Sequence, residues 1–83
     1  MSIEKTIRDY ILENYMFTND ASKLANDDSL LKKGIIDSTG ILEVIGYLGE
    51  EFGVVVKDEE MIPENLDSVN NLVAFVTRKR QTA

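Results

Sequence analysis

The chain contains neither cysteine nor histidine, and this restricts what can hold its 83 residues together. A domain of this size buries only roughly 60 % of the surface that its unfolded chain exposes, so many small domains add disulfides or a metal. Disulfides need cysteine, and the usual zinc sites need cysteine or histidine. Hydrophobic residues make up 43 % of the chain, which is enough for a globular core. We therefore expect one domain, residues 1–83, that folds by packing apolar faces alone.

Apolar residues recur at helical spacing in three segments of the chain. They predict three long helices, over Ser2 to about Met16, Ser38 to Phe52, and Asp67 or Ser68 to about Arg80. Asp37 is the candidate N-cap of the second helix, and Gly53 is its candidate stop. The last helix is expected to bury Val69, Leu72, Val73 and Val76.

The remaining segments predict one short helix and one long loop. A short helical turn is expected over Asp58 to Ile62, ended by Pro63. A structureless loop as long as 17–36 is unusual in a compact domain and has to be held to the core. Its apolar residues are the expected anchors: Leu24, Leu30, Leu31, Ile35 and Ile36. The predicted fold class is all-α, a four-helix bundle of three long helices and one short helix, with a long first loop.

The formal net charge is −6. A surface of this sign repels nucleic acid and anionic membranes, and it suits a basic protein partner. The sequence has no apolar stretch of membrane-spanning length and no signal-peptide pattern. We expect a cytoplasmic monomer with no membrane span and no nucleic-acid partner.

Asp37-Ser38, at the start of the second helix, is the strongest candidate site. A group attached to Ser38 would meet the free N–H groups and the positive dipole end of that helix, which favour a phosphate. Since the chain has no thiol or imidazole of its own, a reactive group would have to be brought to it. The alternative is that Asp37 and Ser38 only cap the helix, because Asp67-Ser68 shows the same pattern before another helix.

Thr39, Leu42, Gly46 and Gly49 fall on one stripe of the second helix, bordered by Glu43 and Glu50. Glycine inside a helix costs about 1 kcal/mol relative to alanine, so a gain elsewhere is expected. One explanation is that a partner protein docks closely on this stripe. The other is that a segment of the same chain packs there, and the sequence leaves both open.

The sequence has none of the common patterns of a catalytic or metal site. Neither 26–28 nor 58–60 fits a calcium loop, and no glycine-rich phosphate loop or Ser/His/Asp set occurs. We expect no catalytic residues and no metal, and therefore not an enzyme.

The stretch from Gly34-Ile35-Ile36-Asp37-Ser38 through Glu50-Glu51-Phe52-Gly53 resembles the acyl carrier protein family, and so does 63–69. The resemblance implies that Ser38 carries 4′-phosphopantetheine, installed from coenzyme A by a phosphopantetheinyl transferase. Asp37 would help to orient the transferase and its metal ion. The thiol of the arm would hold acyl or aminoacyl groups as thioesters and present them to partner enzymes.

Thr39 departs from the family pattern, in which many members have leucine after the serine. Asp-Ser-Thr resembles discrete, standalone carriers that an adenylate-forming acyl or aminoacyl ligase loads, D-alanyl carriers among them. A downstream acyltransferase or synthase would then take the group. The alternative function is a non-covalent helical interaction module in which Ser38 is only a helix cap.

Overall fold

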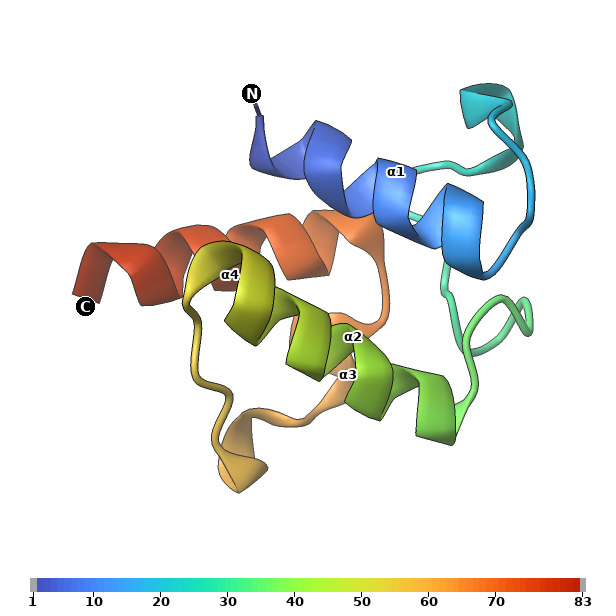
Figure 1. Ribbon diagram of the computed structural model, residues 1–83. Helices are drawn as coiled ribbons and strands as arrows, with labels where there is room; N and C mark the ends of the chain where they lie inside the picture. Colours follow the sequence, from blue (N-terminus) through green and yellow to red (C-terminus); the bar gives the residue numbers. More distant parts are fainter. Residues whose placement is uncertain (1, 83) are drawn as a thin grey trace.

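The computed structural model describes the backbone of residues 2–82 and the side chains of residues 2–80. Its elements are α1 (Ile3–Asn14), η1 (Ala21–Lys23), α2 (Ser38–Phe52), η2 (Asp58–Glu60), α3 (Pro63–Leu66) and α4 (Val69–Thr82) (Figure 1). The η elements are single 3₁₀ turns, and the described residues contain no strand. The prediction of an all-α bundle with three long helices and one short one is confirmed.

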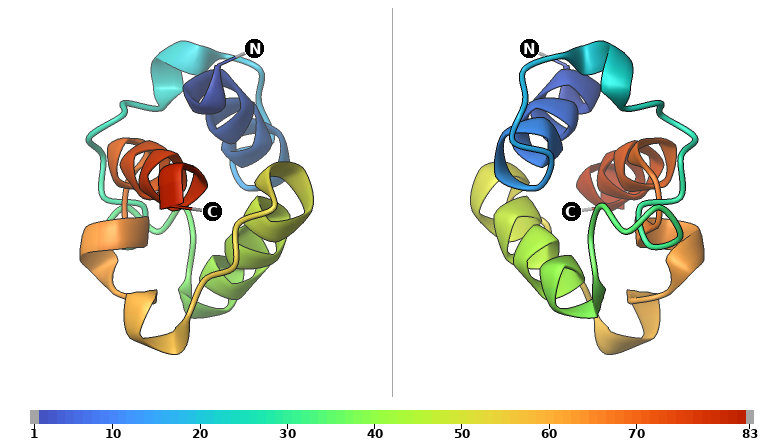
Figure 2. Two further views of the ribbon diagram at one scale, coloured as in Figure 1. Left: turned by 90° about the vertical axis from the view of Figure 1, so that its left-hand side faces the viewer. Right: turned by 90° about the vertical axis from the view of Figure 1, so that its right-hand side faces the viewer.

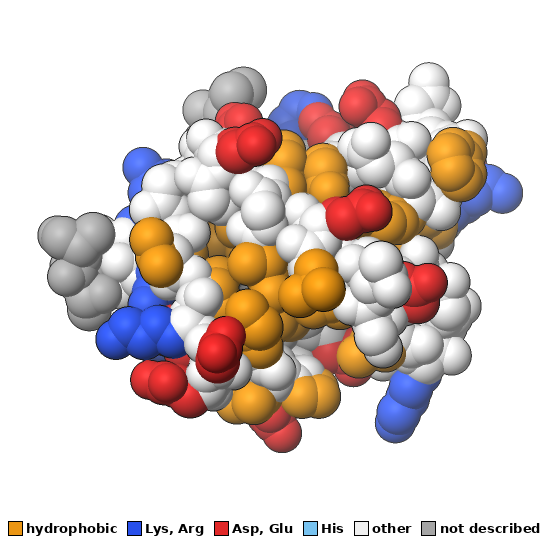
Figure 3. Space-filling view, turned by 60° about the horizontal axis from the view of Figure 1, so that its bottom comes forward, with side chains coloured by type: hydrophobic (Ala, Val, Ile, Leu, Met, Phe, Trp, Pro, Cys, Tyr) orange, Lys and Arg blue, Asp and Glu red, His pale blue; other side chains and the backbone are white. Residues whose placement is uncertain are grey.

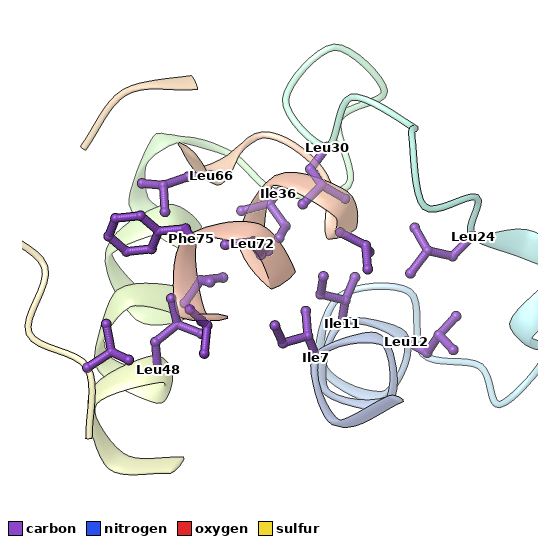
Figure 4. Close-up of a cluster of buried hydrophobic side chains, with 14 residues drawn as sticks. Ile7, Ile11, Leu12, Leu24, Leu30, Ile36, Leu48, Leu66, Leu72 and Phe75 are labelled. Carbon is purple, nitrogen blue, oxygen red and sulfur yellow. The ribbon is translucent and has the colours of Figure 1, made fainter. Parts of the chain in front are cut away.

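The three long helices surround one core, and the long first loop wraps around one side of it (Figure 2). Side chains from α1, α2 and α4 meet there with Leu30 and Ile36 of the loop (Figure 4). Phe75 is fully buried in this core, although the sequence prediction did not include it, and Val73 is only half-buried. Phe75 is buried because α3 packs against α4 and widens the buried face of α4 beyond a single stripe.

The ends of α1 and α2 follow the predicted caps. The Ser2 hydroxyl accepts the N–H of Lys5 at 3.0 Å and begins α1. An Asp37 carboxylate oxygen accepts the N–H of Gly40 at 2.7 Å and begins α2. Gly53 ends α2 in the left-handed region, with φ of 69°, and its N–H donates to the carbonyl of Gly49 at 3.1 Å. These bonds satisfy backbone groups that a helix leaves unpaired at its ends.

The helical turn expected over Asp58 to Ile62 is present as the shorter 3₁₀ turn η2. The sequence analysis missed α3, which Pro63 begins instead of only ending the preceding turn. Proline suits the first position of a helix, because its φ is already helical and its missing N–H would have no partner there.

Polar bonds, as well as apolar burial, hold the first loop to the core. Leu24, Leu30 and Ile36 are buried as expected, Ile35 is half-buried, and Leu31 is exposed, which corrects its expected role. The sequence analysis treated Asp67 only as a candidate helix cap and missed its bonds to the first loop. Its carbonyl accepts the N–H of Leu30 at 2.7 Å, and its carboxylate accepts the N–H of Leu31 at 3.0 Å and the hydroxyl of Ser29 at 2.7 Å.

Asp67 and Ser68 therefore have separate roles. Asp67 ties the loop to the junction of α3 and α4. The Ser68 hydroxyl accepts the N–H of Asn71 at 3.1 Å and caps α4, so Ser68 is the cap that the sequence left undecided. Ser68 is also buried, which distinguishes it from the exposed Ser38.

Candidate site at the start of α2

Ser38 is the first residue of α2, and its side chain is exposed. The preceding Asp37 is also exposed, but one of its carboxylate oxygens, Oδ1, is occupied as the helix cap. The cap fixes the backbone on both sides of Ser38, so the hydroxyl projects from a rigid helix start. A serine held in this way is accessible to an enzyme and lies at the positive end of the α2 dipole.

Gly40 is buried two residues after Ser38, and the packing there requires glycine. A Cβ at this position would lie 2.8 Å from Cγ2 of Ile36 and 3.3 Å from both Asp37 Oδ1 and Cε1 of Tyr15. The loop before Ser38 and the end of α1 therefore press directly on the first turn of α2. Close packing within the chain explains this glycine.

Gly46 and Gly49 differ from Gly40, because both are exposed. A Cβ on Gly46 would meet no atom within 4 Å, and a Cβ on Gly49 would make an ordinary 3.5 Å contact with the carbonyl of Val54. The suggestion that another described segment packs on this stripe is therefore wrong for Gly46. Thr39 is exposed and Leu42 is 59 % exposed, so all four residues of the stripe face solvent.

The two glutamates that border the stripe have different surroundings. The Tyr15 hydroxyl donates to Oε2 of Glu43 at 2.9 Å and lies 3.4 Å from the carbonyl of Gly40. Burial, together with Tyr10 and Glu43, raises the pKa of the Tyr15 hydroxyl, so it remains a donor. Glu43 thus braces α2 against α1. Glu50 is exposed near the other end of the helix.

An apolar cleft of about 190 Å³ lies beside Ser38. Its lining comes from the first loop, α2 and the segment that leads into α3, namely Leu31, Ser38, Ile41, Met61, Ile62, Pro63 and Leu66. Figure 3 brings forward the face at the bottom of Figure 1, where hydrophobic side chains gather around a hollow. Leu31, Met61 and Ile62 are 38 %, 37 % and 42 % exposed, so this apolar surface is open to water.

The sequence analysis did not find the cleft. Its walls come from three segments that are separate in the sequence, and the residues outside α2 show no helical or strand period. The available signal was the pair of large apolar residues before Pro63, which the prediction treated as part of a turn.

The described residues contain neither an acidic cluster suited to a metal ion nor a helix suited to cross a membrane. No group of three or more acidic side chains in residues 2–80 is arranged to hold a metal ion. Within the same part of the chain, no helix is both long and apolar enough to cross a membrane.

No protein-family model matches the sequence. The chain is 32 % identical over 76 residues to a D-alanyl carrier protein of Streptococcus suis, with 92 % of each chain covered. It is 28 % identical over 76 residues to an acyl carrier protein of Campylobacter hominis, covering 92 % of this chain and 91 % of the relative. The chain belongs to the acyl carrier protein family.

A solved structure shows the same fold as this carrier protein. The solution NMR structure of a holo acyl carrier protein from Nitrosomonas europaea matches it with a TM-score of 0.78 at 23 % identity, covering 98 % of this chain and 99 % of the other. Carrier proteins serve partner enzymes and are not catalysts themselves. The resemblance found in the sequence and the expectation of a non-enzymatic carrier are therefore confirmed.

Proposed function

We propose that the carrier protein holds its cargo on a 4′-phosphopantetheine arm attached to Ser38. The observation that carries the proposal is the exposed Ser38 hydroxyl at the capped start of α2. In attachment, the Ser38 oxygen forms a bond to a phosphorus of coenzyme A, adenosine 3′,5′-bisphosphate leaves, and the hydroxyl proton is lost. The thiol of the arm then supplies the thioester chemistry that the chain lacks.

The surroundings of Ser38 fit both parts of such an arm. The phosphodiester carries a negative charge, which the positive end of α2 favours. The apolar cleft that Ser38 shares with Leu31, Ile41 and Ile62 offers the arm a surface on which to lie. Asp37 has a free carboxylate oxygen, since the cap uses only Oδ1. We assign that oxygen the predicted role of orienting the transferase and its metal ion.

The cargo we propose is a small aminoacyl group, D-alanyl by preference, loaded by an adenylate-forming ligase and passed to a downstream acyltransferase or synthase. The S. suis relatives are named D-alanyl carrier proteins, and Thr39 follows the attachment serine as in ligase-loaded carriers. Leu48, Leu72 and Val76 are fully buried in the core, so a long alkyl chain would have to displace packed side chains. A short polar group can stay outside the bundle.

Partner enzymes dock, in this proposal, on the exposed stripe of α2. Gly46 and Gly49 leave the helix backbone open to close approach, and Leu42 is the one large apolar side chain on the stripe. The acidic Glu43 and Glu50 at its border favour a basic partner surface and speed encounter. In this proposal, the protein acts in the cytoplasm as a monomer.

Intact mass after co-expression with a broad-specificity transferase tests the attachment. The wild type should gain one phosphopantetheine mass. Ser38→Ala should gain none while its helical circular dichroism is retained, and Ser68→Ala, the matched control at the second Asp-Ser pair, should be modified like the wild type. A wild type that is never modified, with partners that bind it all the same, would contradict the proposal in favour of a non-covalent interaction module.

A further inference from the structure

Phe17, just after α1, has two features that are each unfavourable in the free protein: an exposed aromatic ring and a positive φ. Its side chain is 84 % exposed, the largest value among the large hydrophobic residues that the structure describes. Its φ is 54°, and Phe17 is the one non-glycine residue of the described chain with a positive φ. An ordinary side chain crowds the backbone in this left-handed region, which is why glycine or asparagine is usually found there.

The turn at Phe17 is needed, but its ring is not. The positive φ brings the N–H of Thr18 back to the carbonyl of Leu12 at 3.0 Å, which satisfies a carbonyl at the end of α1. Asparagine would make the same turn with less strain. The exposed ring adds almost nothing to the core. Strain that folding does not require points to a function for the side chain.

Phe17 lies at the end of the molecule that carries Ser38. Two residues before it, Tyr15 bonds to Glu43 and packs against Gly40, so the end of α1 is fixed against the first turns of α2. Figure 1 shows the end of α1 and the start of α2 on the same side of the molecule. A protein that docks over Ser38 commonly covers roughly 800 Å² of its partner, an area wide enough to reach from α2 to this turn.

The surroundings of Phe17 select the kind of partner. The ring shares a shallow depression with Glu13, Thr18 and Asn19, and Asp20 follows. Glu13 and Asp20 make this rim acidic, and the whole chain has a net charge of −6, so the surface around Phe17 disfavours an anionic membrane and a second copy of the same acidic chain. An apolar pocket edged by lysine or arginine complements it, since cations also bind the faces of aromatic rings.

We propose that Phe17 is an anchor for the enzyme that charges the arm, inserting into an apolar pocket with a cationic rim. The inference rests on the proposed function of Ser38. Single aromatic side chains often dominate the binding energy of an interface. The exposed ring thus becomes useful only in the complex, where it is buried.

The test is Phe17→Asn, which keeps the turn and removes the ring. The free protein should become more stable, with Tm raised by about 4 °C or more, since about 1 kcal/mol corresponds to that shift in a small domain. Loading of the holo protein with ATP and D-alanine, by the adenylate-forming ligase of the same genome, should show a KM for the carrier raised about tenfold or more with kcat unchanged. A gain in stability with a loss of recognition separates a docking role from a structural one.

Val55→Asn is the matched control. Val55 is 76 % exposed but follows the far end of α2, so its loss should leave the KM unchanged. A Phe17→Asn protein that is modified on Ser38 and loaded with the wild-type KM would overturn the inference and leave the proposed function standing. Failure of Ser38 to be modified in the wild type would instead contradict the proposed function.

Fluorine NMR of protein labelled with fluorophenylalanine tests the contact without any loading step. The chain has three phenylalanines, and the fully buried Phe75 and half-buried Phe52 serve as internal references. Adding the ligase should shift the Phe17 signal and leave the other two in place. An unshifted Phe17 signal with bound ligase would refute the anchor. Phe17-dependent binding to phosphatidylglycerol vesicles, or a wild-type dimer that Phe17→Asn dissociates, would equally refute it by identifying a different occupant.

Discussion

Replacing Gly40 by alanine measures how tightly the start of α2 is packed. The added Cβ would lie 2.8 Å from Cγ2 of Ile36, which is closer than real Cβ contacts allow, and Ile36 is only 1 % exposed and cannot turn into solvent. Forcing a methyl group into such a site costs about 1–3 kcal/mol. Alanine returns at most about 1 kcal/mol through its better helix propensity. The net expectation is a loss of up to about 2 kcal/mol.

Gly46→Ala is the control on the same helix. Its Cβ would meet nothing within 4 Å, so only the propensity gain of about 1 kcal/mol remains. The propensity gain is common to both variants, so they should differ by the packing cost of roughly 1–3 kcal/mol, and a small domain shifts Tm by about 4–8 °C for each kcal/mol. Thermal melts followed by circular dichroism, with urea titrations at 25 °C, measure the difference. Equal stabilities for Gly40→Ala and Gly46→Ala would refute the packing argument at Ser38.

Four further changes test the remaining roles. Ser68→Ala should lower the free energy of unfolding by about 0.5–2 kcal/mol in urea titrations, as loss of a helix cap does. Asp67→Ala should cost about 1–3 kcal/mol, because the Leu31 N–H and the Ser29 hydroxyl lose their acceptor, and amide exchange should accelerate at residues 29–31. The pKa of Glu60 is lowered below its usual 4.5, first by the hydrogen bond from the Lys57 N–H and second by the bond from Lys79. The wild type should therefore be more stable than Glu60→Gln above pH 4.5, and thermal melts should show this stability difference vanishing as the pH falls below 4.5. Leu42→Ala should raise the KM of the carrier for its transferase without changing Tm, and an unchanged KM would exclude Leu42 from the docking surface.

The long helices and their caps could be predicted from the sequence because both are local properties. The period of apolar residues and Asp37 with Gly53 define α2, and the structure has the predicted bounds. The exposure of Ser38 follows from its place at the helix start. Pro63 was misread, because elements of three or four residues are shorter than any period that could indicate them.

The rest of the fold depends on contacts between distant segments. The bond from Ser29 to Asp67 joins residues 38 positions apart, and no local pattern records it. The sequence analysis did not single out Gly40, because glycine is required there by the approach of Tyr15 and Ile36. The cleft beside Ser38 was missed for the same cause, since its walls meet only in three dimensions.

The bonds of Asp67 have a mechanical consequence for that cleft. Leu31 on one wall is tied to Asp67, and Leu66 on the other wall is its neighbour in the chain. These two walls are linked to each other through Asp67. Widening of the cleft beside Ser38 therefore requires displacement of α2 relative to both walls. Such a displacement would carry Ser38 and Ile41 together, because both belong to α2, so the width of the cleft and the position of the attachment serine are coupled.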